Sequence, residues 1–155
     1  GTFFGPREAA SRVRDTRRPP LQVLARARHG ETAILPRAGR RDWLYVRDAA
    51  AAMASLLDQP HWGYPRYNLA AGFEWSVADW CACIAPRYPG FEWRLAAPGE
   101  QPDIDYFADY DRASMDIQRL LDDTTFRPRF GLTEAYADYH HWLEEHGTDR
   151  CHSTP

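Results

Sequence analysis

Basic residues crowd one short turn of the sequence, between two apolar runs. A guanidinium binds phosphate or carboxylate oxygens through paired hydrogen bonds, and a glycine lets a ligand approach the backbone closely. The turn is therefore a candidate anion-binding site. The alternative is a solvated basic turn whose arginines are held in ion pairs by Asp42 and Asp48. The residues of the turn are Arg37, Gly39, Arg40, Arg41 and Asp42.

A metal site is a second possibility, near the C-terminal end of the sequence. His141 and Glu145 stand four residues apart, which places both side chains on one face of a helix, and Cys151 and His152 follow shortly after. Histidine, carboxylate and thiolate groups are zinc ligands. Polar residues on the last turns of a terminal helix usually face solvent, however, so we expect no bound metal.

Aspartates recur through a third segment, residues 103–116. Paired carboxylates can act as general acid and base, and spread carboxylates can bind Ca²⁺. The segment lacks the glycine and the terminal glutamate of an EF-hand loop, so we expect loop and helix-capping roles instead. The residues are Asp103, Asp105, Asp109, Asp111 and Asp116.

The composition excludes several mechanisms for these residues. All nineteen basic residues are arginine, so no lysine is available for a Schiff base, a phosphate-binding loop or a Tyr-x-x-x-Lys relay. Arginine stays protonated and cannot act as the base. The ten glycines include no G-x-G-x-x-G spacing, so the sequence encodes no cradle for a dinucleotide pyrophosphate. We therefore expect this chain alone to bind no cofactor.

Charge, hydropathy and cysteine content indicate the expected environment. A formal net charge of −3 argues against nucleic acid as a partner. We find no apolar run near the ~20 residues of a membrane span and no signal-peptide pattern, so we expect no membrane association. Three cysteines, with Cys81 and Cys83 two apart on an expected helix, make no disulfide framework. These features predict a cytoplasmic location with reduced thiols.

The elements that position these residues alternate between strands and helices. With 155 residues, 44% hydrophobic and 14% aromatic, the chain has enough apolar side chains for one core. Asp48 is expected to cap one helix, and Ser76 with Asp79 to cap another that ends before Pro86. The alternation indicates an α/β class, within a larger α/β protein. We expect strands at 2–4, 32–35, 42–46, 67–70 and 91–95, and helices at 21–29, 49–57, 77–84, 112–121 and 133–146, with Gly30 and Gly147 as stops.

Four segments, in this order, resemble the extended short-chain dehydrogenases/reductases of the NAD-dependent epimerase/dehydratase family. Residues 3–8 (FFGPRE) are similar to the family's [VTF]-[YF]-G-P-[RG] segment, and residues 41–50 (RDWLYVRDAA) to its R-D-[FYW]-[LIV]-[YH]-V-x-D-x-A block. Residues 67–77 are similar to the Y-N-[LIV]-[GA]-x-G segment of nucleotide-sugar epimerases. Residues 126–143 resemble the closing W-x-P-x-x-x-L-x-E-G element, with Phe126 and Ala135 in place of its tryptophan and glycine.

The resemblance implies the C-terminal, substrate-binding half of a Rossmann-type extended short-chain dehydrogenase, mostly its smaller mixed α/β domain. Residues 1–147 are expected to form this region and residues 148–155 a flexible tail. In the family, the N-terminal half carries the glycine-rich NAD(P) loop and the Tyr-x-x-x-Lys pair, and we expect it outside this chain. The intact protein would bind NAD or NADP, act as a sugar-nucleotide epimerase, dehydratase or reductase, and form a homodimer. This portion alone would be inactive.

The resemblance also assigns substrate-binding residues. Arg41 matches the arginine that binds the diphosphate of a nucleotide-sugar substrate, with Arg40 beside it in the basic turn. The segment from Leu35 to Gly39 matches the strand and loop against the nucleotide base, and Arg7 belongs to the loop that approaches the substrate. No arginine stands at the family's second phosphate-binding position, so other sugars, acids or alcohols stay open as substrates. A competing interpretation is a non-catalytic ligand-binding or assembly module that keeps this scaffold.

Overall fold

The computed structural model describes residues 2–8, 18–106 and 108–146. Three expectations fall outside these residues: Gly147 as a helix stop, and Cys151 and His152 as possible metal ligands. The expected tail, residues 148–155, also lies outside them. No helix in the described part of the chain is long and apolar enough to cross a bilayer.

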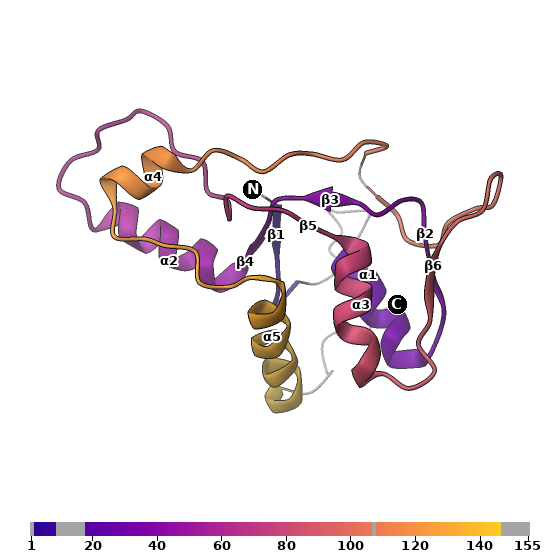
Figure 1. The fold of residues 1–155 in the computed structure, drawn as a ribbon. Helices are drawn as coiled ribbons and strands as arrows, with labels where there is room; N and C mark the ends of the chain where they lie inside the picture. The colour runs from indigo at the N-terminus through magenta and orange to yellow at the C-terminus, as the bar shows by residue number, and fades with distance from the viewer. Residues whose placement is uncertain (1, 9–17, 107, 147–155) are drawn as a thin grey trace, which may run out of the picture.

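Six strands in the described residues form three two-stranded sheets (Figure 1). β1 lies parallel to β4 and β2 lies parallel to β6, whereas β3 and β5 are antiparallel, with Arg41 opposite Trp75. Parallel pairing of strands that are separated by helices confirms the α/β class. The bounds are β1 (Thr2–Phe4), β2 (Ala33–Leu35), β3 (Arg40–Arg41), β4 (Trp43–Tyr45), β5 (Trp75–Ser76) and β6 (Trp93–Leu95).

The helices begin and end at local sequence features. α1 starts at two prolines and ends at Gly30, whose φ of 65° suits glycine and whose N–H donates to the Ala27 carbonyl. Ser76 caps α3: its hydroxyl accepts the Asp79 N–H at 3.0 Å, and the Asp79 carboxylate accepts the Ser76 N–H at 2.8 Å. The bounds are α1 (Pro19–His29), α2 (Val46–Leu57), α3 (Val77–Ile84), a 3₁₀ turn η1 (Ala85–Arg87), α4 (Gln118–Asp123) and α5 (Leu132–His146).

The elements form two ends joined by the central strands (Figure 1). α2 packs against α4 at one end, and α1 packs against α3 at the other, beside β2 and β6. β1, β4, β3 and β5 lie between these ends, and α5 packs against α3 below them. The basic turn begins after β2 and includes β3, so it runs from one end of the molecule toward its centre.

Aromatic side chains fill the centre of the core. The Phe4 ring lies 5.1 Å from the Trp75 ring and 5.8 Å from the Trp80 ring, both edge-on. Trp43 stacks on Trp75 at 5.3 Å. Large rings bury much apolar area, and edge or offset contacts between them add to the stability of the core. This cluster joins β1, β4, β5 and α3, and so fixes the strand that carries Arg41 through its partner Trp75.

Two expected elements are wrong. Residues 67–70 form no strand, and this segment is joined to the chain before α4 by the Asn68 side chain, which donates to the Asp116 carbonyl at 2.8 Å. The expected helix at 112–121 is helical only from Gln118. Upstream of it, the Arg112 N–H donates to the Arg40 carbonyl at 3.1 Å and the Met115 N–H to the Asp42 carboxylate at 3.1 Å. These donors are therefore lost to an α-helix.

The cap assigned to Asp48 is also wrong. α2 begins at Val46, two residues earlier, and Asp48 lies buried within its first turn. The Asp48 carboxylate accepts the backbone N–H groups of Arg129 and Phe130 at 2.9 and 3.0 Å. It therefore joins α2 to the chain segment before α5 instead of closing its own helix.

Candidate anion-binding site

The basic turn borders a small hollow on the described surface. The turn enters from β2 and leaves through β3, so the strand pairs on both sides fix its ends. A guanidinium-rich hollow of this kind can hold an oxyanion. The lining residues are Pro19, Arg37, Gly39, Arg40, Arg41, Trp43, Val77 and Tyr106.

Arg37 is occupied by contacts within the protein. Its Nε donates to the Asp111 carboxylate at 2.8 Å, and its Nη2 donates to the carbonyls of Ala108 and Tyr110 at 2.7 and 2.8 Å. Its guanidinium also lies over the Tyr106 ring, 4.9 Å from the centroid. Arg37 thus holds the loop after Tyr106 against the turn.

A close contact with the Tyr106 ring requires a glycine at position 39. Its φ is 76°, and a Cβ built there would lie 2.5 Å from Cε2 of Tyr106. The Tyr106 hydroxyl donates to the Arg37 carbonyl at 2.8 Å, which keeps the ring in place. The close approach to the backbone that the sequence suggested for a ligand is made here by Tyr106.

Arg41 differs from Arg37 because its charge is not neutralised. Its guanidinium lies 5.8 Å from the Trp43 ring centroid. In the part of the chain that the structure describes, no carboxylate lies within ion-pair distance of it. Burial, and after it the charges of Arg112 and Arg37, lower the pKa of Arg41. The group stays protonated at neutral pH, so it is a half-buried cation that lies near other cations.

Arg112 approaches the turn from a distant part of the sequence. Its N–H donates to the Arg40 carbonyl, and its Nη2 donates to the Tyr110 hydroxyl at 3.1 Å. Sequence reasoning missed this residue, because only the loop held by Arg37 brings it to the turn. Arg40 itself is exposed at the rim of the hollow.

The ion pairs that the alternative interpretation gave to Asp42 and Asp48 are not found among the described residues. The buried Asp42 carboxylate accepts backbone N–H groups of Ala71, Gly72 and Met115 at 2.7, 3.0 and 3.1 Å. Asp48 likewise binds backbone, as described above. The Asp42 carboxylate is directed toward these N–H groups and makes no ion pair with Arg41 in the described residues, which leaves the Arg41 guanidinium available to an external anion.

Two other predicted substrate-binding residues lie apart from the hollow. Leu35 is fully buried in β2, and its carbonyl accepts the Ala96 N–H at 2.8 Å. Arg7 is exposed with a φ of 67°, just after Gly5, which packs against the Tyr45 ring. The structure thus brings Gly39, Arg40 and Arg41 together and keeps Leu35 and Arg7 outside their group.

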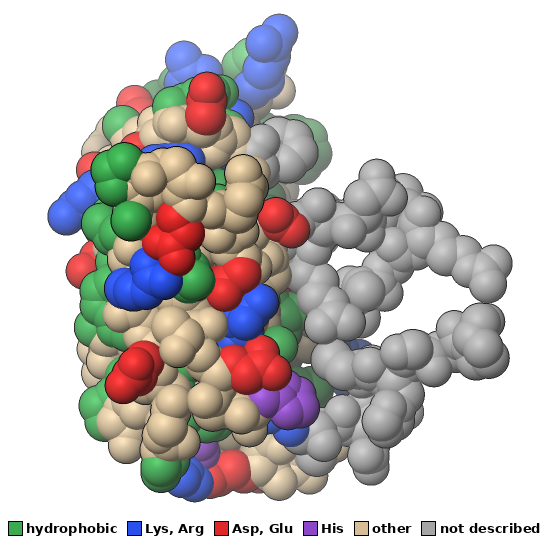
Figure 2. Space-filling view, turned by 90° about the vertical axis from the view of Figure 1, so that its right-hand side faces the viewer, with side chains coloured by type: hydrophobic (Ala, Val, Ile, Leu, Met, Phe, Trp, Pro, Cys, Tyr) green, Lys and Arg blue, Asp and Glu red, His purple; other side chains and the backbone are tan. Residues whose placement is uncertain are grey.

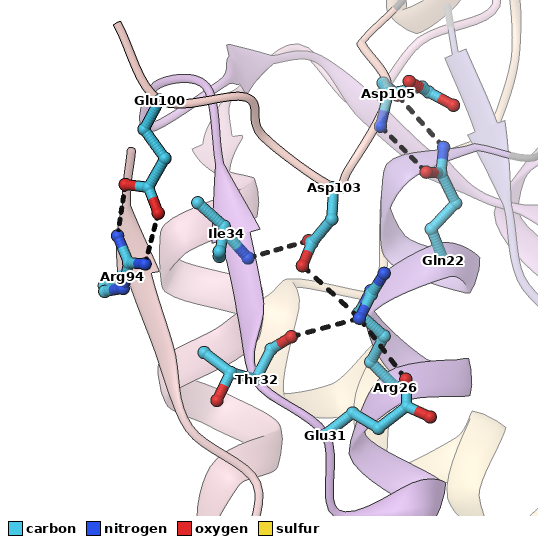
Figure 3. Close-up of polar contacts among 9 residues, drawn as sticks. All are labelled: Gln22, Arg26, Glu31, Thr32, Ile34, Arg94, Glu100, Asp103 and Asp105. Carbon is cyan, nitrogen blue, oxygen red and sulfur yellow. Dashed lines mark hydrogen bonds and ion pairs between the residues drawn. The ribbon is translucent and has the colours of Figure 1, made fainter. Parts of the chain in front are cut away.

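The acidic segment has the loop and capping roles expected of it. Asp103 accepts the Ile34 N–H at 2.8 Å and pairs with Arg26 at 3.3 Å, which joins the segment to β2 and α1 (Figure 3). Asp116 accepts the N–H of Gln118 at the start of α4. At the other candidate cluster, His141 and Glu145 pair on the exposed surface of α5. Among the described residues, no three His, Cys, Asp or Glu side chains group as metal ligands.

The described turn from β4 into α2 does not have the composition of a dinucleotide-binding turn. A pyrophosphate cradle needs a glycine-rich turn between a strand and a helix, with helix N–H groups pointing at the phosphates. The turn from β4 into α2 has the sequence Tyr45-Val46-Arg47-Asp48 and contains no glycine. This turn therefore provides no cradle for a pyrophosphate.

The first part of the sequence matches a protein-family model. The model is described as the NAD dependent epimerase/dehydratase family, and the match covers residues 1–70, from β1 through the basic turn and α2. The match covers 70 of the 155 residues, which is less than half of the chain. It supports the resemblance read from the sequence over these residues. A comparison with curated protein sequences found no match.

The fold matches about half of several solved enzymes. UDP-N-acetylglucosamine 4-epimerase from Bacillus cereus has 17% identity and a TM-score of 0.69, over 99% of this chain and 45% of that one. MoeE5, in complex with UDP-glucuronic acid and NAD, has 20% identity and a TM-score of 0.63, over 94% of this chain and 45% of that one. A GalE-like L-threonine dehydrogenase from Cupriavidus necator has 25% identity and a TM-score of 0.62, over 78% and 44%.

Proposed function

We propose that this chain is the substrate-binding, C-terminal portion of an NAD(P)-dependent sugar-nucleotide epimerase, dehydratase or reductase. In this proposal Arg41 binds a phosphate group of the substrate. The observation that carries it is the state of Arg41, a half-buried guanidinium near two other arginines with no carboxylate partner in the described residues. A cation in such surroundings favours an anionic ligand over water.

The other residues of the turn support Arg41 in different ways. Arg112 adds a second positive charge from the loop that Arg37 holds, so the two arginines can approach different oxygens of a diphosphate. Asp42 fixes the strand beside Arg41 through its backbone hydrogen bonds. These residues bind and orient the substrate, which contributes to catalysis by positioning. The hydride chemistry belongs to a cofactor-binding part outside this chain.

A small carboxylate substrate is a second candidate, favoured by one specific observation. The structure with 25% identity to this chain is an L-threonine dehydrogenase. A guanidinium binds a carboxylate by the same paired hydrogen bonds as a phosphate. Arg41 would then hold the carboxylate of an amino acid or a hydroxy acid, with the same part of the molecule acting as the substrate site.

Calorimetric titration of the 155-residue chain with UDP, and separately with L-threonine, tests these candidates. We expect UDP to bind and Arg41→Ala to weaken it by about tenfold or more, because a charge-assisted hydrogen-bonding group is lost. Arg87→Ala is the matched control, since Arg87 pairs with Glu144 on the surface and lies outside the hollow. An Arg41→Ala variant that binds UDP as tightly as the wild-type chain would contradict phosphate binding at Arg41. Arg41-dependent binding of threonine without UDP binding would favour the second candidate.

The competing module without catalysis makes a separate prediction. A non-catalytic module of this kind would bind UDP in an Arg41-dependent manner. An intact protein that contains this chain would then not reduce NAD⁺ or NADP⁺. We expect such a protein to turn over a sugar nucleotide with one of these cofactors, measured by the absorbance of the reduced nicotinamide and by product analysis. Substrate binding without any turnover would favour the module.

A further inference from the structure

One face of α2 is both apolar and exposed. Met53 is 44% exposed and Leu57 is 77% exposed, and the exposed Ala50 and Ala54 lie beside them. The spacing of these four residues, i, i+3, i+4 and i+7, places them on a single stripe of the helix, here called the α2 stripe. An apolar surface that continues over two helical turns is typical of a contact with another protein surface.

α2 packs against the rest of the molecule through a different set of residues. Ala49 packs with Leu44 of β4, and Ala52 packs with Leu120 of α4. The α2 stripe lies beside this buried face and stays accessible, and α2 itself lies at one end of the molecule (Figure 1). Packing of the core therefore does not require apolar side chains at the four positions of the stripe.

We infer that the α2 stripe binds the same stripe of a second copy of this chain, with the two helices antiparallel. About a two-fold axis midway between positions 53 and 54, Leu57 faces Ala50 of the second copy, and Met53 faces its Ala54. Each large side chain then meets a small one, and the two-fold axis makes every contact twice. A parallel pair would instead set leucine against leucine and alanine against alanine.

The charges at the two ends of α2 agree with antiparallel pairing. Arg47 pairs through its Nε with Asp138, but its side chain is still 55% exposed and a guanidinium has further N–H donors. Asp58, at the other end, is exposed and makes no ion pair among the described residues. In the antiparallel pair, Arg47 of one copy lies about two residues, or ~3 Å along the helix axis, from Asp58 of the other. These opposite charges attract each other on one border of the stripe.

The length of α2 sets the strength expected of this dimer. Its 12 residues span about 18 Å, so a single pair of helices buries less surface than the ~1,200 Å² of the smaller stable interfaces. We therefore expect a concentration-dependent dimer with a Kd of about 10–100 μM. The dimer does not involve the basic turn, so phosphate binding at Arg41 can fail or hold independently of it.

Sedimentation velocity of the 155-residue chain, from about 1 to 500 μM, tests the dimer. We expect the average mass to rise from monomer toward dimer, and Leu57→Lys to weaken the association about tenfold or more, because two lysines replace two apolar contacts. Leu95→Lys is the matched control, since Leu95 is 51% exposed on β6, outside the stripe, and this variant should associate like the wild-type chain. A chain that stays monomeric throughout would overturn the inference and leave the stripe to a different partner. A dimer that Leu57→Lys does not weaken would also overturn it.

Disulfide cross-linking tests the antiparallel arrangement without removing an apolar face. In chains with Cys83→Ser and Cys151→Ser, a mixture of the Ala50→Cys and Leu57→Cys variants should form a cross-linked pair on oxidation, because positions 50 and 57 of the two copies face each other. Either variant alone should not cross-link, since its two copies are about 10 Å apart along the axis, whereas a disulfide needs Cβ atoms about 4 Å apart. Cross-linking of Leu57→Cys with itself, and not with Ala50→Cys, would overturn the antiparallel pair.

Discussion

Two regions of the molecule place arginine and carboxylate side chains close together and use them in opposite ways. On the face formed by α1, β2 and β6, Arg26 pairs with Asp103 and Arg94 pairs with Glu100 (Figure 3). Figure 2 shows acidic and basic side chains interspersed over this side of the molecule. In the basic turn, Arg41 lies near other arginines, and the adjacent Asp42 binds backbone N–H groups instead.

The difference separates structural charge from charge that is available to a ligand. A neutralised arginine on the surface contributes little beyond local order. A half-buried arginine without a carboxylate destabilises the unliganded protein, because burying an unpaired charge costs free energy. The binding of an anion offsets this cost. Residue type alone does not distinguish the two regions. The pairing of each charge does.

The largest effect is expected at Asp42. Asp42→Ala leaves three backbone N–H donors without their acceptor in a buried place, so we expect a loss of about 3 kcal/mol in the free energy of unfolding, measured by urea denaturation. Asp103→Ala, in the paired region, removes one N–H bond and one partly exposed ion pair, and we expect about 1 kcal/mol. Equal losses in the two variants would contradict the contrast between the regions.

A smaller effect is expected at the glycine of the turn. Gly39→Ala combines a left-handed φ with a clash against the Tyr106 ring, so we expect a loss of about 2 kcal/mol and weaker UDP binding. Gly99→Ala is the matched control. Its φ of 81° is similar, but a Cβ there meets nothing within 4 Å. The expected loss of stability is therefore only the cost of the left-handed backbone for alanine, about 1 kcal/mol. Thermal unfolding of both variants measures the difference, and a Gly39→Ala variant as stable as Gly99→Ala would show that Tyr106 can move aside.

Arg37 tests whether the loop carrying Arg112 depends on its anchor. Arg37→Met keeps the aliphatic stem and removes hydrogen bonds to Asp111 and two carbonyls, for which we expect about 1 kcal/mol in urea denaturation. UDP affinity should also fall, because Arg112 is no longer held near Arg41. Arg94→Met removes an exposed pair and should leave both quantities nearly unchanged. A loss of stability without a loss of UDP affinity would show that Arg112 does not contribute to UDP binding.

Features set by neighbouring residues could be predicted from the sequence. Gly30 ends α1 and the Ser76–Asp79 box begins α3, as expected, because each motif satisfies backbone groups within a few residues of itself. The short strands β1, β2, β4 and β6 also agree with their apolar patterns. The basic residues were grouped correctly because they are contiguous, but Arg40 and Arg41 form the strand β3 instead of a turn, since they pair with Ser76 and Trp75.

Features set by distant contacts could not be predicted. Arg112 reaches the turn only because Arg37 fixes a loop about seventy residues away in sequence. The roles of Asp42 and Asp48 depend on backbone groups around positions 71, 115 and 129, which no local pattern reveals. Among the described residues the buried Trp43 Nε1 has no hydrogen-bond partner, and this is a property of packing. The sequence indicates a tryptophan in a buried strand, but not whether its nitrogen finds an acceptor.

The smallest effect concerns Glu100 in the paired region, and it appears in titration. The hydrogen bonds from Arg94, and after them that from the Ala97 N–H, lower the pKa of the Glu100 carboxyl from 4.5 to about 2. Because the folded pKa lies below the unfolded one, the stabilising contribution is present above pH 4.5 and is lost as the pH falls toward 2. NMR titration of the side-chain carboxyl should show this low midpoint, and Arg94→Gln should raise it toward 4.5. A midpoint that does not change in the variant would mean that the pair in Figure 3 is not maintained in solution, and the contrast with the unpaired Arg41 would then rest on Arg26 and Asp103 alone.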